Sequence, residues 1–329
     1  MTPLLRLAHV SKRFAPHVAI TDRLAAWLGA PVETRTVYAV DDVSLAIGKG
    51  EVLGLVGESG CGKSTLARII AGIHAPSSGE ALYDGMAIMS SARQPVKTLT
   101  KIQMIFQDPF ASLDPRLRIG DTIAEGPLAH RLVTRAGAPD YVRDWLAAVG
   151  LPGDAAERFP HQFSGGQRQR VAIARALAMK PDLLVCDEPI ASLDVSIQAQ
   201  IVNLFLKLKR ELSLAMLFIS HDLGVVRHIS DRVAIMYLGR IVESGPTPEI
   251  YRSPRHPYTK ALLDSVPKLT VDGTDVVSFK PIEGELPSPL NPPSGCHFHL
   301  RCTFAQPRCK VDAPRLDHAS QAVACHYPL

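Results

Sequence analysis

The sequence predicts an α/β fold in which a large domain with a parallel sheet is followed by a smaller appendage. An apolar run at residues 52–56 leads through a glycine-rich turn into a helical pattern at residues 66–71. Further largely apolar runs occupy residues 182–187, 215–220 and 232–237. Continuous runs of this length are typical of strands buried on both faces of a parallel sheet. The chain of 329 residues is longer than the usual single core, so two parts are expected.

The regions around these runs predict more strands, an insertion and a helical segment. Residues 4–10 and 39–47 alternate between apolar and polar side chains, which predicts two strands. Residues 15–36, which carry two prolines and a short apolar patch, predict a surface insertion with one helical turn. Residues 101–106 predict a further strand, and residues 110–160 switch to a helical periodicity with polar breaks.

A complete GxxxxGK[ST] motif follows the first apolar run. It consists of Gly57, Glu58, Ser59, Gly60, Cys61, Gly62, Lys63, Ser64 and Thr65. Glycines let backbone N–H groups and the next helix N-terminus point at a phosphate, whose negative charge the helix dipole favours. Lys63 adds a positive charge for the β- and γ-phosphates, and the Ser64 hydroxyl suits Mg²⁺. A chance glycine-rich turn is the alternative, but strand, loop and helix follow in the order that a nucleoside triphosphate site requires.

Two adjacent carboxylates end the apolar run at residues 182–187. Asp187 is placed to hold Mg²⁺ directly or through water. Glu188 is placed to orient and deprotonate a water that attacks the γ-phosphate. An Asp-Glu-Pro sequence also caps turns, which is the structural alternative. The phosphate-binding motif upstream favours the catalytic interpretation.

A second glycine pair opens a helical pattern downstream, at Ser164, Gly165, Gly166 and Gln167. Serine followed by two glycines at a helix start leaves backbone N–H groups available for a phosphate. The chain therefore carries two candidate phosphate sites. Proteins with both usually close them against each other across a dimer, so that this helix of one subunit contacts the γ-phosphate held by the other.

In their order and spacing these motifs resemble those of the ATPase subunits of ABC transporters. The matching set is Gly57–Thr65, Gln107, Ser164–Gln167, Asp187-Glu188, Ser192-Leu193-Asp194 and His221. The resemblance covers roughly residues 4–250 and implies a RecA-like P-loop ATPase core for residues 1–250. It places a helical signature subdomain at about residues 108–180 and leaves residues 251–329 as a small irregular C-terminal extension.

The resemblance also implies a role for the residues around the phosphates. Ser64, Gln107 and Asp187 would hold Mg²⁺ beside ATP, and Gln107 would couple the nucleotide state to membrane subunits. Glu188 would act as the catalytic base, and His221 would contact the γ-phosphate.

Further positions are assigned by the resemblance alone. Phe14 would stack on adenine, with Tyr38 as the alternative, and Asp194 would lie in a loop that crosses the dimer interface. Residues 164–167 would complete the ATP site of the partner subunit. Homodimer and heterodimer look alike from one chain, and a heterodimer with a sister ATPase is the expectation.

Three other segments, at residues 105–115, 253–259 and 284–296, resemble the ATPases of dipeptide and oligopeptide importers. The insertion before the phosphate loop and the sequence at residues 58–62 resemble the second, F-type ATPase of such systems. The resemblance implies ATP-driven import through two transmembrane permease subunits, supplied by an extracytoplasmic substrate-binding protein. Peptide is the expected substrate. Importers of nickel or glutathione share this branch, and a soluble ABC ATPase without a membrane partner is the remaining alternative.

The charge and hydropathy of the chain limit the kinds of partner that are expected. The 36 basic and 32 acidic residues nearly cancel and are dispersed, so no nucleic-acid partner is expected. No charge-free apolar run approaches the roughly 18 to 20 residues that cross a bilayer. The chain is therefore expected at the cytoplasmic face of the cell membrane as a peripheral subunit.

Four of the six cysteines lie within the last 34 residues, at Cys296, Cys302, Cys309 and Cys325. The proline-rich path between them predicts little core, so a cross-linking centre would supply order there. Disulfides are disfavoured in the cytosol. Four thiolates suit a [4Fe–4S] cluster or tetrahedral Zn²⁺. A mixed site would add His297, His299 or His326, and free thiols are the last alternative.

The importer branch carries an iron–sulfur cluster in this region in some members, which favours the cluster here. Because the tail and the phosphate loop are assigned to different domains, a change at Cys302 is expected to leave ATP binding at Lys63 largely intact. Cys61 and Cys186 are expected to be small packing residues.

Overall fold

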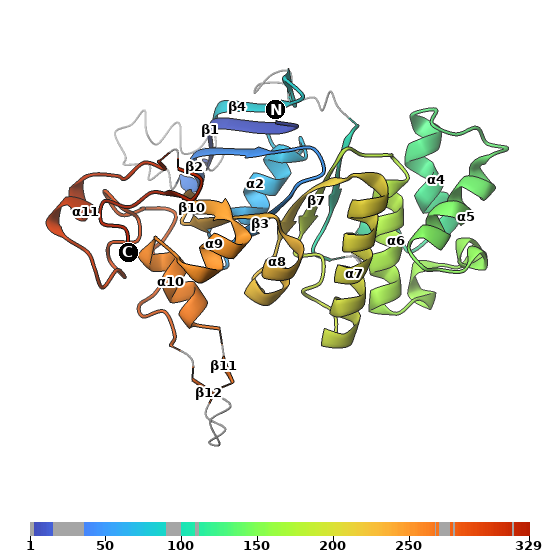
Figure 1. The fold of residues 1–329 in the computed structure, drawn as a ribbon. Coiled ribbons are helices and arrows are strands. Elements are labelled where there is room, and N and C mark those ends of the chain that lie inside the picture. The colour runs from blue at the N-terminus through green and yellow to red at the C-terminus, as the bar shows by residue number, and fades with distance from the viewer. Residues whose placement is uncertain are drawn as a thin grey trace, which may run out of the picture.

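The computed structural model describes residues 3–15, 36–89, 100–108, 112–266, 268–269, 277–278, 280–317 and 319–329. The predicted insertion at residues 15–36 lies almost entirely outside the described residues, and so do residues 109–111 of the importer-like segment. The fold is of the predicted α/β class, and Figure 1 shows it as a row of strands with helices packed along it.

The larger sheet has seven strands in the order β13-β10-β9-β3-β8-β7-β6. Their bounds are Val52–Val56 (β3), Ile102–Ile105 (β6), Leu183–Asp187 (β7), Ala215–Ile219 (β8), Arg232–Tyr237 (β9), Arg240–Pro246 (β10) and Ala322–Val323 (β13). The strands from β9 to β6 are parallel, whereas β10 and β13 are antiparallel to their neighbours. All residues of β3, β7 and β8 are buried, as expected for parallel strands covered on both faces. Their carboxyl ends share one edge, where open α/β sheets bind ligands.

A smaller antiparallel sheet has the order β2-β1-β4-β5. Its strands are Leu5–Phe14 (β1), Val37–Ile47 (β2), Ser78–Tyr83 (β4) and Met86–Ala87 (β5). Helix α2, at Lys63–Ile70, lies between this sheet and β3 (Figure 1). Leu5, Leu53 and Ile69 belong to one buried apolar cluster, so the two sheets and α2 share a core. This core fixes the helix whose first three residues are the last three of the phosphate-binding motif.

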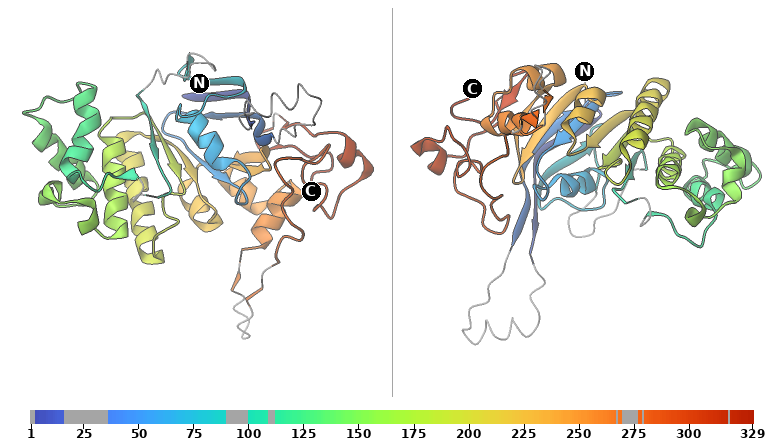
Figure 2. Two further views of the ribbon diagram at one scale, coloured as in Figure 1. Left: turned by 180° about the vertical axis from the view of Figure 1, so that it is seen from behind. Right: turned by 90° about the horizontal axis from the view of Figure 1, so that it is seen from below.

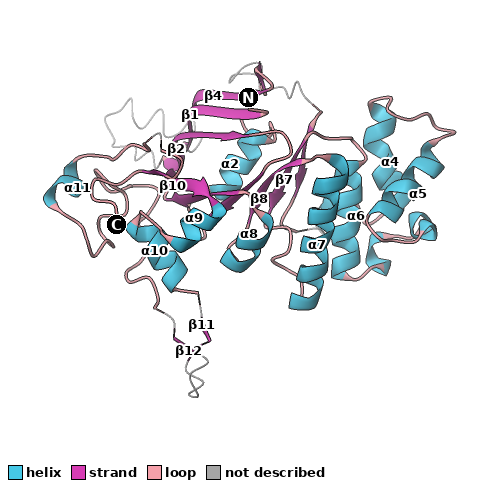
Figure 3. Cartoon of the chain, viewed as in Figure 1, coloured by secondary structure: helices cyan, strands magenta, loops and turns pink. Residues whose placement is uncertain are grey.

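The remaining helices divide between the sheet and a separate helical region. They are Ile119–Ala129 (α4), Ala138–Ala148 (α5), Gly165–Leu177 (α6), Val195–Leu212 (α7) and Leu223–Ile229 (α8), with short 3₁₀ helices at Gly153–Glu157 (η1) and Pro160–Gln162 (η2). Helices α6 and α7 lie side by side, and α4 and α5 stand beyond them, away from the strands (Figure 3). Apolar side chains of α4, α5 and α6 share a buried cluster with residues of α7 and of the larger sheet, so these helices pack onto the sheet.

The C-terminal part packs at the opposite end of the molecule from α4 and α5, as both views in Figure 2 show. Its elements are Thr247–Arg252 (α9), Pro257–Asp264 (α10), Lys268–Leu269 (β11), Val277–Ser278 (β12) and Pro307–Val311 (α11). Strand β13 of this part pairs with β10 and extends the larger sheet. The C-terminal part is therefore built onto the sheet.

An aromatic cluster joins this part to β9. Phe298 is 3% exposed, and its ring centroid lies 5.2 Å from that of Tyr237 and 5.3 Å from that of Tyr258. Aromatic rings at such distances add attraction to the area that they bury. The prediction that the extension builds little core is wrong around Phe298, because Phe298 and Tyr258 of the extension pack against each other and against Tyr237 of the sheet.

Candidate functional site

The phosphate-binding motif forms a tight loop between β3 and α2. Gly62 ends it with φ at +109°, and a Cβ there would lie 2.1 Å from the carbonyl oxygen of Ala39. A side chain at this position would both clash and strain the backbone. The glycine thus has a local reason in the fold, which is the close approach of β2.

Lys63 lies at the start of α2 and is only 5% exposed. Its Nζ donates hydrogen bonds to the carbonyl oxygens of Gly57 at 2.7 Å and Glu58 at 2.9 Å. An ammonium group has three donors, so it can bond the loop and a phosphate oxygen. The loop therefore fixes the position of the Lys63 ammonium group, and its role in phosphate binding stays a prediction.

Ser64 and Asp187 meet at the end of β7. The Ser64 hydroxyl donates to Asp187 Oδ1 at 3.0 Å, and Asp187 is 4% exposed. Burial raises the pKa of the Asp187 carboxyl, and Ser64, Arg68 and Lys63 only partly oppose that effect. Hydroxyl and carboxylate oxygens are the ligands that Mg²⁺ prefers.

Three of the predicted residues converge beyond the ends of β6, β7 and β8. Gln107 Nε2 donates to Glu188 Oε2 at 3.1 Å, and His221 Nδ1 lies 3.6 Å from the same oxygen. The Glu188 side chain is 15% exposed, whereas that of His221 is 64% exposed. Glu188 also has φ at +47°, a conformation that non-glycine residues rarely adopt. The carboxylate is therefore held by its backbone and its neighbours.

The second predicted phosphate site forms the N-terminus of α6. Ser164 Oγ accepts a hydrogen bond from the Gln167 backbone N–H at 3.4 Å, and Gln167 Oε1 accepts one from the Ser164 N–H at 3.0 Å. A Cβ on Gly166 would lie 2.5 Å from Ile197 Cγ2, so α6 approaches α7 closely there. Ser164 is exposed, as is Asp194 at the N-terminus of α7. This surface is open to a second molecule.

The two candidate adenine-binding aromatics lie at one end of the smaller sheet. Phe14 is 38% exposed and stands edge-on to His74, with their ring centroids 5.6 Å apart. The Arg13 guanidinium lies 5.0 Å from the centre of the Tyr38 ring. Both aromatics flank the undescribed residues 16–35, and the choice between them stays a prediction.

The cysteines fall into two groups. Cys61 and Cys186 are 1% and 0% exposed, and burial raises the pKa of both thiols, which suits packing residues. Four others line one cavity, namely Cys296, Cys302, Cys309 and Cys325. The free volume of this cavity is about 10 Å³, roughly the room for one water molecule. Within the described residues, no three His, Cys, Asp or Glu side chains form a group that could hold a metal ion.

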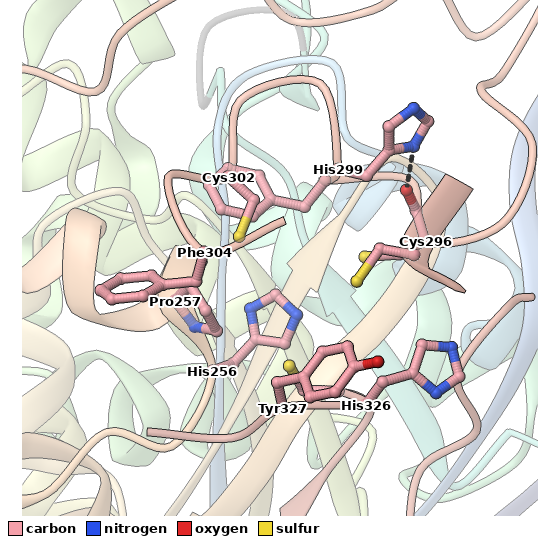
Figure 4. Close-up of a pocket in the computed structure, with 11 residues that line it drawn as sticks. His256, Pro257, Cys296, His299, Cys302, Phe304, His326 and Tyr327 are labelled. Atoms are coloured by element: carbon pink, nitrogen blue, oxygen red, sulfur yellow. Dashed lines mark hydrogen bonds between the residues drawn. The ribbon is translucent and has the colours of Figure 1, made fainter. Parts of the chain in front are cut away.

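His256 projects into this cavity, and the Cys296 and Cys302 sulfurs point toward the same space (Figure 4). Its Nδ1 accepts a hydrogen bond from the Tyr258 N–H at 3.0 Å, so the ring proton lies on Nε2. Nε2 is buried and has no partner among the described residues. Burial lowers the pKa of His256 to about 3, which keeps the ring neutral. The cavity therefore offers an unpaired N–H donor beside four thiols.

The three histidines weighed for a mixed site separate in space. His299 and His326 line the cavity. His297 instead lies with Nδ1 at 3.0 Å from the carbonyl oxygen of Leu238.

Residues of the C-terminal part that the sequence did not single out contact the phosphate loop. The hydroxyl of Tyr258 accepts a hydrogen bond from the Glu58 N–H, and Arg301 pairs with the Glu58 carboxylate. Arg301 lies 243 positions from Glu58, so no local pattern could have predicted the contact. The two parts are therefore in direct contact at the phosphate loop, while the expected effect of a change at Cys302 on ATP binding stays a prediction.

In the described part of the chain, we find no helix whose length and hydropathy would let it cross a membrane.

Comparisons with known proteins agree with this geometry. Residues 40–191 match the family "ABC transporter", and residues 242–309 match "Oligopeptide/dipeptide transporter, C-terminal region". The chain is 50% identical over 294 residues to the oligopeptide transport ATP-binding protein AppF of Bacillus subtilis, covering 88% of this chain and 89% of the relative. It is 49% identical to OppF of Salmonella typhimurium, covering 91% and 90%. It is 47% identical to the di/tripeptide transport ATP-binding protein DppF of Pseudomonas aeruginosa, covering 88% and 90%.

Two solved structures share the fold. CbiO1 from Clostridium perfringens, part of an ABC transporter complex, superposes with a TM-score of 0.62 at 28% identity, covering 76% of this chain and 91% of that chain. The ATP-binding cassette MJ0796, determined as a dimer with ADP and Pi, gives a TM-score of 0.59 at 26% identity, covering 74% and 98%.

Proposed function

This chain belongs to the ATP-binding proteins of oligopeptide and dipeptide ABC transporters, and on that premise we propose that it powers the import of di- or oligopeptides. The observation that carries the proposal is the identity of about half of the residues to such relatives across both matched regions. ATP hydrolysis is the reaction, and the peptide is moved without being modified. Hydrolysis drives a conformational cycle of the transporter.

The phosphate loop binds ATP in this proposal. Lys63 and the backbone N–H groups of residues 57–65 bind the β- and γ-phosphates. Ser64, Gln107 and Asp187 hold Mg²⁺, which neutralises charge on the phosphates when it is bound. The oxygen donors fit this ion, since the buried Asp187 carboxylate and the Ser64 hydroxyl already adjoin.

Glu188 is the general base that accepts a proton from the attacking water. The hydrogen bond from Gln107 orients its carboxylate, and Glu188 has an unusual backbone conformation, with φ at +47°. His221, beside the same carboxylate oxygen, contacts the γ-phosphate. Phe14 stacks on the adenine, with Tyr38 as the alternative.

A second ATPase subunit completes the site. The N-terminus of α6, with Ser164 through Gln167, binds the γ-phosphate held by the partner, and Asp194 lies at the interface. The exposure of Ser164 and Asp194 supports this arrangement. We favour a heterodimer with a sister ATPase over a homodimer.

The division of labour follows the proposed domains. Residues 1–250 form the nucleotide-binding domain, with the helical subdomain at about 108–180, and residues 251–329 form the C-terminal extension. Two transmembrane permease subunits carry the peptide, which an extracytoplasmic substrate-binding protein delivers. The chain works as a peripheral subunit at the cytoplasmic face of the membrane, without a nucleic-acid partner.

The thiol-lined cavity is the candidate for a further cofactor, and we propose a [4Fe–4S] cluster there, with Zn²⁺ as the alternative. The side chains suit such a cofactor in type, because four thiols line one cavity and the unpaired Nε2–H of His256 can donate a hydrogen bond into it. Burial, together with the neighbouring thiols, raises the pKa of Cys296 to about 11, so a cation is needed to hold this group as a thiolate. The donors do not fit in spacing, since no described group is arranged to hold a metal ion. No step of hydrolysis depends on this cofactor.

Purification of the chain together with its co-expressed neighbours tests the proposed assembly. Permease subunits and a sister ATPase that copurify in stoichiometric amounts are the expected result. Recovery of the chain as a homodimer that activates ATP hydrolysis without any membrane partner would contradict the importer proposal and favour a soluble ABC ATPase. If the associated substrate-binding protein binds nickel or glutathione and not peptides, the substrate of the importer is that compound and not a peptide.

A further inference from the structure

Glu58 of the phosphate loop is held from the C-terminal extension at two points. The hydroxyl of Tyr258 accepts a hydrogen bond from the Glu58 backbone N–H at 3.0 Å. The two terminal nitrogens of Arg301 donate to the two carboxylate oxygens of Glu58, at 2.7 and 3.1 Å. Such a fork fixes direction as well as distance.

The third contact of Glu58 leads to the phosphate-binding lysine. The Glu58 carbonyl oxygen accepts a hydrogen bond from Lys63 Nζ at 2.9 Å. The same carbonyl oxygen lies 3.3 Å from the Cys61 backbone nitrogen that donates to it. The Glu58 carbonyl oxygen, together with that of Gly57, therefore orients the ammonium group, and it also helps to fix the curl of the loop.

Arg301 is built into the protein rather than resting on its surface. Its side chain is 6% exposed, and that of Glu58 is 23% exposed. Its Nε donates to the carbonyl oxygen of Glu283 at 3.1 Å, and its guanidinium lies 5.9 Å from the centre of the Tyr237 ring. Exposed ion pairs contribute little to stability, whereas a buried one is costly to break, because its partner is left as an unpaired charge.

We propose that Arg301 is a positioning residue for nucleotide binding, which acts from the C-terminal extension by holding Glu58 and, through it, the phosphate loop and Lys63. Arg301 does not contact the nucleotide in this role. Its contacts are with Glu58, Tyr237 and Glu283 rather than with the catalytic Glu188. It therefore acts on affinity for ATP and leaves the hydrolytic step largely alone.

The place of Arg301 in the chain connects this role to the thiol-lined cavity, a step that rests on the cofactor site proposed above. Arg301 directly precedes Cys302, and both Cys302 and Cys296 line the cavity. The backbone N–H groups of His299 and Arg301 bond to the carbonyl oxygens of Cys296 and Phe298, each at 3.0 Å. This compact segment therefore joins the two cysteines to Arg301.

The test measures the affinity of the full-length chain for a fluorescent ATP analogue and the kcat and KM of its hydrolysis. Arg301→Gln is expected to weaken binding about tenfold, as loss of a hydrogen bond to a charged group predicts. Arg301→Lys keeps the charge but loses the two-pronged hydrogen bonding, so its affinity for the ATP analogue should lie between those of the parent chain and of Arg301→Gln. KM for ATP should rise as the affinity falls, while kcat stays within about threefold. Arg308→Gln is the matched control, because Arg308 pairs with Asp312 in the same extension with its side chain 59% exposed.

A double-mutant cycle with Glu58→Gln separates positioning from general damage to the fold. The second substitution should add less than about twofold to the first, because both remove the same contact. Arg301→Gln with the affinity of Arg308→Gln, or fully additive effects, would overturn the proposal. If Arg301→Gln fails to fold, Arg301→Lys enters the cycle under the same criterion. Because binding is measured on the chain alone, failure of peptide transport would bear on the proposed function and not on this result.

Discussion

The exchange of Glu188 for glutamine removes the proposed base with little change in shape. The amide oxygen of the new side chain can still accept the hydrogen bond that Gln107 now donates at 3.1 Å, so the side chain should keep its place. It cannot accept the proton of the attacking water. Loss of a general base lowers rates by about 10²–10⁴-fold, which corresponds to about 2.7–5.4 kcal/mol in the barrier.

Single-turnover hydrolysis of γ-labelled ATP measures this loss directly. Binding of ATP should persist, because Lys63 bonds the loop independently of Glu188. The matched control is Glu211→Gln, since Glu211 lies on α7 with its side chain 54% exposed and should leave the rate unchanged. A Glu188→Gln rate within about tenfold of the parent, in a preparation free of other ATPases, would remove Glu188 from the role of base.

Three further predictions address the dimer, the C-terminal packing and the cofactor. Lys63→Ala should weaken nucleotide binding in its own subunit, whereas Ser164→Arg should leave binding intact and abolish the ATP-dependent dimer seen by light scattering. Mixing the two variants should restore part of the ATPase activity. A normal dimer of Ser164→Arg would contradict the assignment of residues 164–167 as a second phosphate site. Glu243 is 0% exposed and accepts hydrogen bonds from two backbone N–H groups and a side-chain amide. Glu243→Gln should therefore lower the free energy of unfolding by about 1–3 kcal/mol, and an unchanged urea midpoint would disprove this packing role. Anaerobically purified protein should contain about four irons per chain, and the Cys302→Ser variant should lose them. Stoichiometric zinc without iron would favour the zinc alternative. If neither metal is found, the four cysteines are free thiols.

The strands of the larger sheet could be predicted closely because their apolar runs are continuous. Residues 52–56 and 232–237 match β3 and β9 in full, since burial on both faces favours apolar residues along such a strand, with the partly exposed Arg232 at the start of β9 as the exception. Strands β10 and β13 had no such signal. Strand β13 has only two residues, and its place is set by pairing with a strand far away in sequence.

The sequence could predict where the candidate site residues lie relative to the strands and helices, because each follows a strand or precedes a helix, whereas their roles stay predictions. The hydrogen bond of Gln107 to Glu188 joins two of them, as their positions at the ends of neighbouring strands require. The positive φ of Glu188 and the pairing of Arg301 with Glu58 were not predictable. Both depend on tertiary packing, which local propensity and spacing do not encode.

Peptide uptake into proteoliposomes that contain this chain, its sister ATPase and the permease subunits tests the central claim most directly. ATP is supplied on the side of the membrane that carries this chain, and the substrate-binding protein is supplied on the opposite side. Labelled di- or oligopeptide should then accumulate on the side that holds the ATP. Uptake should stop when Glu188→Gln replaces the parent chain, because closure without hydrolysis cannot repeat the cycle. Uptake of nickel or glutathione without uptake of peptide would contradict the account. So would a rate of ATP hydrolysis that is unchanged by the permease subunits and by the loaded binding protein.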